Sequence, residues 1–247
     1  MALQLNRFPD VQQAAQALAQ AVADDLRRAL EQRERALLLV SGGKSPVPFF
    51  TALAAQPLSW DRVDVSLVDE RAVPADHADS NGNMVVAHLL QGAAGAARWL
   101  PLVTAAAAGS DPLALALAAA AAAEANPALA QPAAIVLGMG TDGHTASLFD
   151  DALQWGQACT TQQRYVAIEP KRAPHARISL SLHALIAQRR CYLWSGGDEK
   201  LAVLTRIERT VEAALRDDKR DAVAEAGPIA LLLAEPAVEL RCFHYDG

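Results

Sequence analysis

The stretch that most constrains the fold runs from Ile135 to Phe149 and reads IVLGMGTDGHTASLF. A short apolar run that ends in glycines is typical of a buried strand in a parallel sheet. The polar segment that follows would lie at the carboxyl end of this strand, where open α/β sheets bind their ligands. We therefore expect residues 138–147 to form part of a ligand site, with the carboxylate of Asp142 and the imidazole of His144 on one loop.

The same order of features, an apolar run followed by glycines and a helix, recurs along the chain. Residues 36–40 lead into the loop SGGKSP at 41–46, and residues 191–194 lead into SGGDEK at 195–200. Such a loop points backbone N–H groups and the N-terminus of a helix toward an anion. Neither loop has the GxxxxGK[ST] spacing of a nucleotide-binding P-loop, and a tight turn between strand and helix would leave the same pattern.

Hydrophobic spacing predicts the remaining elements. Helices are expected at 11–32, 47–55, 84–91, 111–125, 183–186 and from 200 to 208 or beyond. Further strands are expected at 63–68, 99–102, 165–168, 177–182 and 228–233, with an edge strand at 238–245. Repeated strand–helix units predict a doubly wound, mainly parallel α/β sheet with helices on both faces. The sequence contains no linker of disordered composition, so we expect a single domain over residues 1–247.

Charged side chains lie at the ends of several predicted strands. Asp69 and Arg71 follow one strand, Arg177 begins another, and Lys200 ends the second glycine loop. Taken one at a time, each also fits a solvated strand end or loop. Because the carboxyl ends of parallel strands converge on one crevice, we expect these residues to share it with the Asp–His pair.

This set of groups favours a phosphorylated substrate and acid–base chemistry. Cations together with backbone amides suit a phosphate, and a histidine beside an aspartate suits proton transfer near neutral pH. The sequence contains no GxSxG nucleophile elbow. We therefore expect activated water or enolisation chemistry without a covalent intermediate.

Composition narrows the choice of partners and compartment. The net charge of −6 and the lack of a basic stripe argue against nonspecific nucleic-acid binding. The start, MALQLNRFPD, does not resemble a secretion signal, and the alanine-rich run at 113–123 is too weakly hydrophobic to span a bilayer. The three cysteines form no metal-binding pattern, and His77 and His88 have no partner at metal-ligand spacing. We expect a cytoplasmic protein with no metal, nucleic-acid or membrane partner.

Four segments together resemble the 6-phosphogluconolactonase family and, more broadly, the glucosamine-6-phosphate deaminase superfamily. They are SGGKSP, VDERAVPADHADSNGNM, GMGTDGHTASLF and RISLSL, and the resemblance extends from about residue 37 to 233. It implies a doubly wound sheet with a Rossmann-like core. It also implies hydrolysis of 6-phospho-D-glucono-1,5-lactone to 6-phospho-D-gluconate, the second step of the oxidative pentose phosphate pathway. A monomer without metal or redox cofactor is further implied.

The resemblance assigns the substrate phosphate to one loop and two cations. The residues similar to the loop that wraps the 6-phosphate are Gly42, Gly43, Lys44 and Ser45. Arg177 and Lys200 resemble the phosphate-binding cations of the superfamily. Asp69 is a further candidate for substrate binding, because it lies at the same strand end as the family arginine.

The resemblance also assigns catalytic roles. His144 resembles the acid–base group of the family, with Asp142 beside it in the same motif, and Arg71 resembles the arginine near the lactone. A δ-lactone is already an activated ester, so the enzyme need not supply a nucleophile. We expect the imidazole to take a proton from the attacking water and to return it to the ring oxygen. Asp142 would orient the imidazole or stabilise its charge, and the arginine would stabilise the oxyanion.

Two departures and two alternatives accompany this interpretation. Asp150 stands where the family usually has proline. Lys44 replaces a small polar residue of the family, and its side chain is expected either to contact the phosphate or to face water. An amino-sugar phosphate deaminase–isomerase would carry an acid where this chain has Phe149, and DEY in place of DER. A non-catalytic sugar-phosphate sensor would carry a DNA-binding helix-turn-helix and tend to lose the Asp–His pair.

Overall fold

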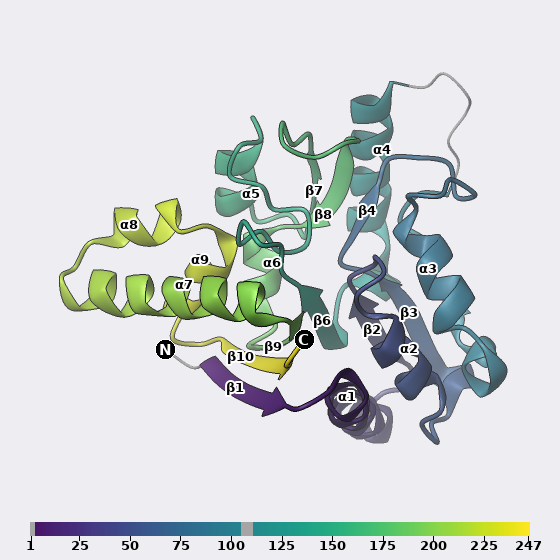
Figure 1. Ribbon diagram of the computed structural model, residues 1–247. Helices are drawn as coiled ribbons and strands as arrows, with labels where there is room; N and C mark the ends of the chain where they lie inside the picture. The colour runs from purple at the N-terminus through teal and green to yellow at the C-terminus, as the bar shows by residue number, and fades with distance from the viewer. Residues whose placement is uncertain (1–2, 105–110) are drawn as a thin grey trace.

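The chain folds around a seven-stranded sheet, shown in Figure 1 in the computed structural model, which describes residues 3–104 and 111–247. The strands of this main sheet are β1 (Leu3–Phe8), β2 (Ala36–Val40), β3 (Val63–Leu67), β5 (Arg98–Trp99), β6 (Pro132–Gly138), β9 (Arg190–Gly196) and β10 (Glu239–Tyr245). Their spatial order is β1-β10-β9-β6-β2-β3-β5, with parallel pairings. The strand order reverses between β2 and β6. The predicted doubly wound, mainly parallel α/β fold is confirmed.

A second, antiparallel sheet stands over the carboxyl edge of the main sheet (Figure 1). Its strands, in spatial order, are β4 (Asp69–Arg71), β8 (Arg177–Leu180) and β7 (Tyr165–Ile168). The sequence suggested that the charged residues after β3 end a strand, but they form a strand of their own in which Asp69 and Glu70 are buried. Arg71 lies opposite Arg177 in the register of β4 and β8. The small sheet therefore brings two predicted site residues side by side.

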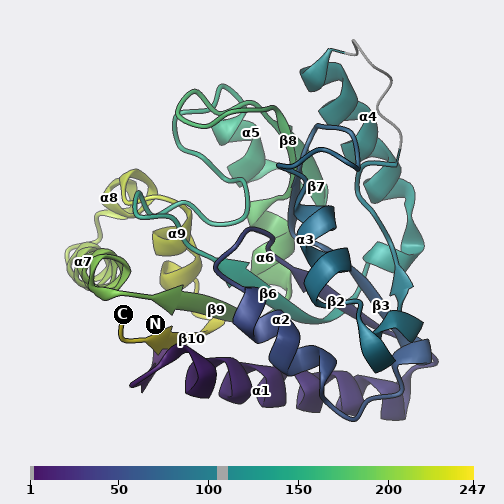
Figure 2. The same cartoon turned by 45° about the vertical axis from the view of Figure 1, so that its right-hand side comes forward.

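Helices cover both faces of the main sheet, as predicted. They are α1 (Val11–Gln32), α2 (Val47–Ala54), α3 (Asn81–His88), α4 (Pro112–Ala125), α5 (Trp155–Thr160), α6 (Leu182–Ala187), α7 (Asp198–Arg216), α8 (Arg220–Glu225) and α9 (Pro228–Ala234), with short 3-10 turns at Trp60–Arg62, Gly92–Ala96 and Pro127–Leu129. Figure 2 shows α1 and α2 on one side of the sheet and α6, α7 and α9 on the other. α1 begins after Asp10, whose carboxylate accepts a hydrogen bond from the Gln13 amide. Leu18 and Leu26 in the apolar stripe of this helix are fully buried.

The alanine-rich helix α4 packs on β7 and β8, so it covers the small sheet. Ala116 is buried together with Ala72, Ala167 and Ala176. Side chains of this size let the helix axis approach the strands closely, which explains why the composition is nearly pure alanine on the buried face. Within the described residues, neither this helix nor any other combines the length and the apolar character that crossing a membrane requires.

Two elements near the end of the chain differ from the prediction. Residues 228–233 were expected to form a core strand, but they form the helix α9, in which Pro228 occupies the first turn. A short apolar run does not distinguish a buried strand from a buried helix. Residues 238–245 were expected at the sheet edge, but β10 lies between β9 and β1. The edge strand is β1, for which the sequence indicated no strand.

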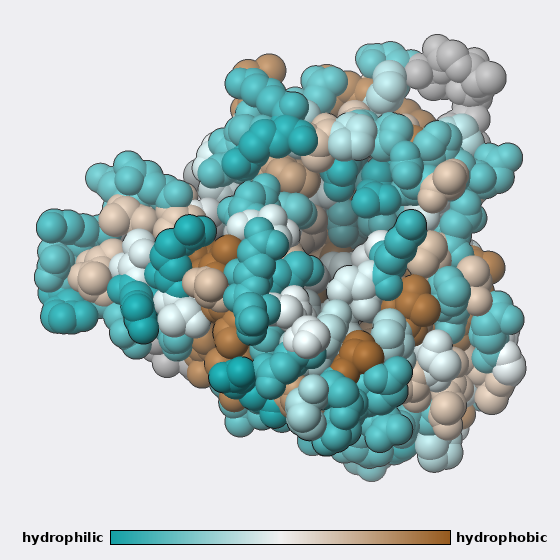
Figure 3. Space-filling view, viewed as in Figure 1, coloured by the Kyte–Doolittle hydropathy of each residue, from teal (hydrophilic) through white to brown (hydrophobic). Residues whose placement is uncertain are grey.

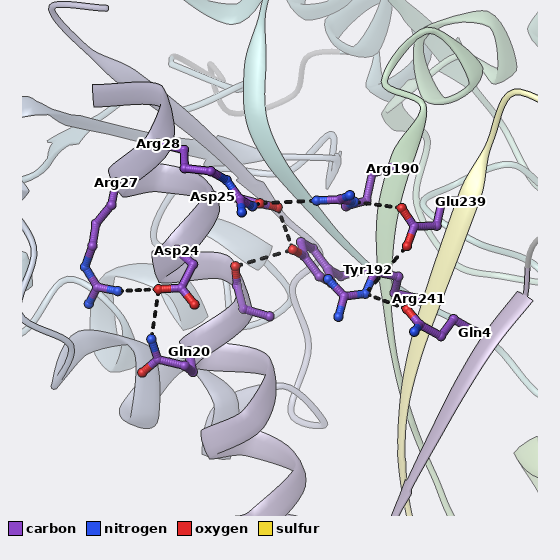
Figure 4. A network of polar contacts seen from close by, with 11 residues as sticks. Gln4, Gln20, Asp24, Asp25, Arg27, Arg28, Arg190, Tyr192, Glu239 and Arg241 are labelled. Atoms are coloured by element: carbon purple, nitrogen blue, oxygen red, sulfur yellow. Dashed lines mark hydrogen bonds and ion pairs between the residues drawn. The ribbon is translucent and has the colours of Figure 1, made fainter. Parts of the chain in front are cut away.

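A polar network ties α1 to the amino-terminal ends of β9 and β10 (Figure 4). Asp25, on α1, is 9% exposed, and its Oδ2 accepts a 2.5 Å hydrogen bond from the Tyr192 hydroxyl. Arg28 and Arg190 form ion pairs with the same carboxylate, and Arg190 also pairs with Glu239 at 2.9 Å. This network lies at the edge of the sheet away from the predicted ligand crevice, so its contribution is to stability.

We expect Asp25→Ala to lower the free energy of unfolding by about 1–3 kcal/mol, because it removes the short hydrogen bond of the buried Tyr192 hydroxyl and one ion-pair partner from each of Arg28 and Arg190. Urea unfolding measures this loss. The matched control is Asp24→Ala, which removes a half-exposed ion pair to Arg27 and should cost about 0–1 kcal/mol. Equal losses in the two variants would contradict the structural role of Asp25.

Candidate active site

A cavity opens at the carboxyl edge of the main sheet where the strand order reverses, between β2 and β6. Figure 3, in the orientation of Figure 1, shows the surface hollowed near the centre of the view. The predicted site residues that line the cavity are Gly42, Ser45, Asp69, Arg71, His144, Arg177 and Lys200. Gly43, Lys44 and Asp142 do not line it, and Lys44 is exposed. The structure therefore brings together most of the residues that the sequence selected from five separate strand ends.

Asp142 acts on the cavity through His144. The imidazole Nδ1 lies 2.6 Å from the Asp142 Oδ1, which also accepts the His144 backbone N–H at 3.3 Å. Partial burial raises the pKa of the Asp142 carboxyl and is the largest single effect, but the hydrogen bonds and positive charge of His144, together with the charge of Arg172, outweigh it in sum and hold the pKa below its usual value. A carboxylate on Nδ1 leaves Nε2 as the nitrogen free to exchange a proton. Asp142 is thus placed to orient the imidazole and to stabilise its charged form.

The glycines of this loop make room for the pair. A Cβ at Gly140 would lie 2.3 Å from the His144 Nδ1 and 2.4 Å from the Asp142 Oδ1. Gly143 has a φ of +85°, a left-handed conformation that glycine adopts without strain. The turn is closed by the Gly140 amide, which donates to the His144 carbonyl at 2.9 Å. Gly140 is therefore required so that Asp142 and His144 can contact each other. The sequence analysis had expected this segment only to form part of a ligand site.

Phe149 supports both the imidazole and a cavity cation. Its ring stacks on the His144 ring with centroids 4.2 Å apart and an interplanar angle of 25°. The Arg177 guanidinium carbon lies 5.2 Å from the same ring centroid. Asp150, which stands in place of a proline, pairs with Arg172, and this arginine also contacts Asp151 at 3.2 Å. The loop that follows the histidine is thus held by stacking and ion pairs.

The two arginines of the small sheet present positive charge to the cavity. Arg71 donates to the Asp79 carbonyl, and Arg177 donates to the Pro174 carbonyl at 3.2 Å and to the Ser147 hydroxyl at 3.3 Å. In the part of the chain that the structure describes, the buried Nε atoms of both arginines lack a hydrogen-bond acceptor. Burial lowers the pKa of Arg177, but an arginine starts from so high a value that it stays charged. Two adjacent cations with unused donors suit an anionic ligand.

The glycine loop and Lys200 form another side of the cavity. The Trp194 indole donates to the Ser45 carbonyl at 2.9 Å, which ties the loop at 41–46 to β9. A Cβ at Gly42 would lie 2.3 Å from the Asn81 Cγ, so this position requires glycine. Lys200 lies in the first turn of α7, where burial lowers the pKa of its ammonium group. Among residues 3–104 and 111–247 it forms no ion pair, so its charge is available to a ligand.

Sequence reasoning missed two functional residues, Glu70 and Asn81. The Glu70 carboxylate accepts the backbone N–H groups of Asn81 and Gly82 at 2.7 Å each, so it anchors the first turn of α3. That helix begins at Asn81, after the cap Ser80, and not near Met84 as expected. The Asn81 amide donates to the Asp69 carbonyl at 2.9 Å, while its buried Oδ1 has no donor among the described residues. Asn81 lines the cavity and offers this oxygen to a ligand hydroxyl. Asn81 lies in the segment VDERAVPADHADSNGNM, which contributed to the family resemblance, but the sequence analysis assigned no role to this residue.

Known proteins resemble the chain over nearly its whole length. A family model described as glucosamine-6-phosphate isomerases/6-phosphogluconolactonase matches residues 9–235. A 6-phosphogluconolactonase of Neisseria meningitidis serogroup A is 36% identical over 243 residues, which cover 98% of each chain. A 6-phosphogluconolactonase of Pseudomonas putida is 40% identical over 211 residues, or 82% of each chain. The crystal structure of a 6-phosphogluconolactonase from Shewanella baltica superposes with a TM-score of 0.83 at 32% identity, covering 100% of this chain and 98% of that one.

Proposed function

Because this chain belongs to the family of glucosamine-6-phosphate isomerases and 6-phosphogluconolactonases, we propose that it hydrolyses 6-phospho-D-glucono-1,5-lactone to 6-phospho-D-gluconate. The observation that carries this proposal is a shared cavity. His144, hydrogen-bonded to Asp142, lines the same cavity as Arg177 and Lys200. A group that transfers protons and groups that bind a phosphate are therefore within reach of one small substrate.

The reaction follows from the placement of these groups. His144 Nε2 accepts a proton from a water molecule as its oxygen attacks the C1 carbonyl of the lactone. Arg71, whose guanidinium keeps an unused donor, stabilises the tetrahedral oxyanion. When the oxyanion collapses, the bond between C1 and O5 breaks, and the imidazolium returns its proton to O5. The products are the open-chain acid and a regenerated neutral imidazole.

The phosphate of the substrate is held away from this chemistry. We assign it to the backbone amides of residues 42–45 and to the cations of Arg177 and Lys200. Gly42, Ser45 and both cations line the cavity. The exposed Lys44 contributes its backbone to the loop, and its side chain faces water. The Asn81 Oδ1 and the Asp69 carboxylate are left to accept hydrogen bonds from the sugar hydroxyls.

Asp142→Asn should lower kcat by about 10²-fold, at the lower end of what a positioned acid–base group contributes. The amide cannot stabilise the imidazolium and can present its NH₂ group to Nδ1, which would leave the proton on Nε2. KM should change little, because Asp142 does not line the cavity. Initial rates of acid release measure both constants. A kcat equal to that of the unaltered protein would exclude the proposed role of Asp142.

The amino-sugar deaminase is the nearest competing function. Phe149 stacks on His144 and occupies the position where that activity would require an acid. The experiment supplies the purified protein with the phosphorylated lactone and, separately, with glucosamine 6-phosphate. Accelerated acid release from the lactone, without ammonia release from the amino sugar, is the expected result. Ammonia release would favour the deaminase, and binding without turnover would favour a sensor.

Three further predictions accompany the lactonase assignment. We propose that the chain is a monomer, that residues 1–247 form one domain, and that it works in the cytoplasm. Sedimentation velocity checks the first, and a single cooperative unfolding transition checks the second. Cell fractionation checks the third.

A further inference from the structure

We infer that His77, Asp79 and His175 bind a divalent metal ion of the Zn²⁺ type at the rim of the proposed active site. The ligand atoms that the three residues offer all lie within 4.8 Å of one another. The His175 Nε2 is 2.9 Å from the Asp79 Oδ2, and the His77 Nδ1 is 3.9 Å from the same oxygen. Two imidazole nitrogens and one carboxylate oxygen form a common Zn²⁺ ligand set, with water in the fourth position.

The dimensions of the cluster suit such an ion. Donors bound to Zn²⁺ in a tetrahedron at about 2.0–2.2 Å lie about 3.3–3.6 Å apart. Because the ligand atoms of the cluster lie within 4.8 Å of one another, the widest separation needs to close by at most about 1.5 Å. His77 and Asp79 have exposed side chains, which can make this movement without disturbing the core. An aspartate is ionised at neutral pH, so Asp79 offers a charged oxygen to the ion.

The cluster joins two loops that the small sheet brings together. His77 and Asp79 lie between β4 and α3, whereas His175 lies just before β8. The sequence led us to expect no metal-binding partner for His77, because the partner is distant in the chain and arrives only when β4 pairs with β8. His175 has a φ of +69°, a left-handed conformation that is strained for a residue with a side chain. The fold holds this conformation, which turns the imidazole toward Asp79.

The loop that carries His77 and Asp79 is held by its own hydrogen bonds. The His77 amide donates to the Pro74 carbonyl at 2.9 Å, and the His77 carbonyl accepts from the Ser80 amide at 3.0 Å and from the Asn83 side chain at 2.9 Å. The Asp79 amide donates to the His77 Nδ1 at 3.1 Å, so this nitrogen is the unprotonated one and its lone pair can also bind a metal ion. A metal ion would replace that amide as the partner of Nδ1. The loop backbone that carries two of the three ligands is thus held before any ion arrives.

Both cavity arginines are hydrogen-bonded to the backbone of the cluster loops. Arg71 donates to the carbonyl of Asp79 itself, and Arg177 donates to the carbonyl of Pro174, next to His175. An ion that joins the two loops would fix both carbonyls and, through them, both guanidinium groups. This consequence rests on the proposed function. If the protein is a lactonase, saturating Zn²⁺ lowers KM for the phosphorylated lactone. Binding of the ion itself does not depend on any activity.

The test is a metal titration of tag-free, chelator-treated protein without substrate. Calorimetry should find one equivalent of bound Zn²⁺, and Co²⁺ should give the visible absorption of a tetrahedral site. His175→Ala and His77→Ala should each weaken the affinity at least about tenfold, the least that perturbing a metal site normally costs. His88→Ala, which removes a histidine from α3 outside the cluster, should bind as the unaltered protein does.

A second control separates this site from the catalytic pair. His144→Ala should bind Zn²⁺ with unchanged affinity if the ion occupies the loop cluster. The inference is overturned if no saturable binding is found, if His175→Ala binds as tightly as the unaltered protein, or if His144→Ala abolishes binding. Because none of these measurements uses the lactone, a failure of the lactonase proposal leaves their outcome interpretable.

Discussion

His144→Ala lowers kcat for the phosphorylated lactone by about 10²–10⁴-fold and leaves KM within a few-fold of its original value. The imidazole is the one acid–base group in the proposed mechanism, so its loss removes proton transfer both when water attacks the carbonyl and when the ring oxygen departs. The phosphate contacts, which determine much of the binding, are made elsewhere in the cavity by residues 42–45, Arg177 and Lys200. Initial-rate measurements, corrected for spontaneous hydrolysis, separate the two constants.

The control for this variant is His183→Ala, which removes a histidine that does not line the cavity. It should retain full kcat and KM. Because the His144 ring stacks on Phe149, circular dichroism and the unfolding midpoint of His144→Ala should be compared with those of the unaltered protein. Full lactonase activity in a folded His144→Ala protein would remove the proposed mechanism.

The second large effect concerns the phosphate. Lys200→Met should raise KM about 10–100-fold, because a hydrogen bond to a charged group contributes about 1.5–3 kcal/mol and each 1.4 kcal/mol is tenfold in affinity. Methionine preserves much of the side-chain stem and removes only the ammonium charge. kcat should change little, since Lys200 is assigned to binding and not to proton transfer.

The substrate itself provides the sharpest control for this variant. With unphosphorylated glucono-δ-lactone, the Lys200→Met and unaltered proteins should have the same kcat/KM, because the contact under test is missing from both. Lys219→Met, which removes an exposed ammonium group at the far end of α7, should leave KM for the phosphorylated lactone unchanged. An equal loss by Lys200→Met on both lactones would show that Lys200 does not act on the phosphate.

The centre of the main sheet could be predicted because β2, β6 and β9 are short apolar runs that lead into glycines. Residues 36–40 and 132–138 are buried along most of their length, and their order relative to the helices indicates a parallel sheet. Residues 228–233 have the same apolar composition, yet form the helix α9. A short apolar run is compatible with a buried strand and with a buried helix, so the packing around residues 228–233 decides which of the two they form. β1 was missed because its residues are only half-buried or exposed, without a regular alternation, and because the strand depends on its pairing with β10.

Much of the candidate site could be predicted because it lies at strand ends. Topology alone brings Gly42, His144 and Lys200 to one cavity. The role of Asn81 could not be predicted, because it depends on the buried Glu70 that anchors α3 and on the close approach of Asn81 to Gly42. The His77–Asp79–His175 cluster was hidden for a similar reason: its two loops meet only through the pairing of β4 with β8.

The most direct test of the proposed function is acid release from freshly prepared 6-phospho-D-glucono-1,5-lactone, with and without the purified protein. We expect a rate far above the spontaneous one, saturable in substrate, with a much higher KM for glucono-δ-lactone because that substrate lacks the phosphate. A rate equal to spontaneous hydrolysis, from protein whose circular dichroism shows it to be folded, would contradict the proposed function.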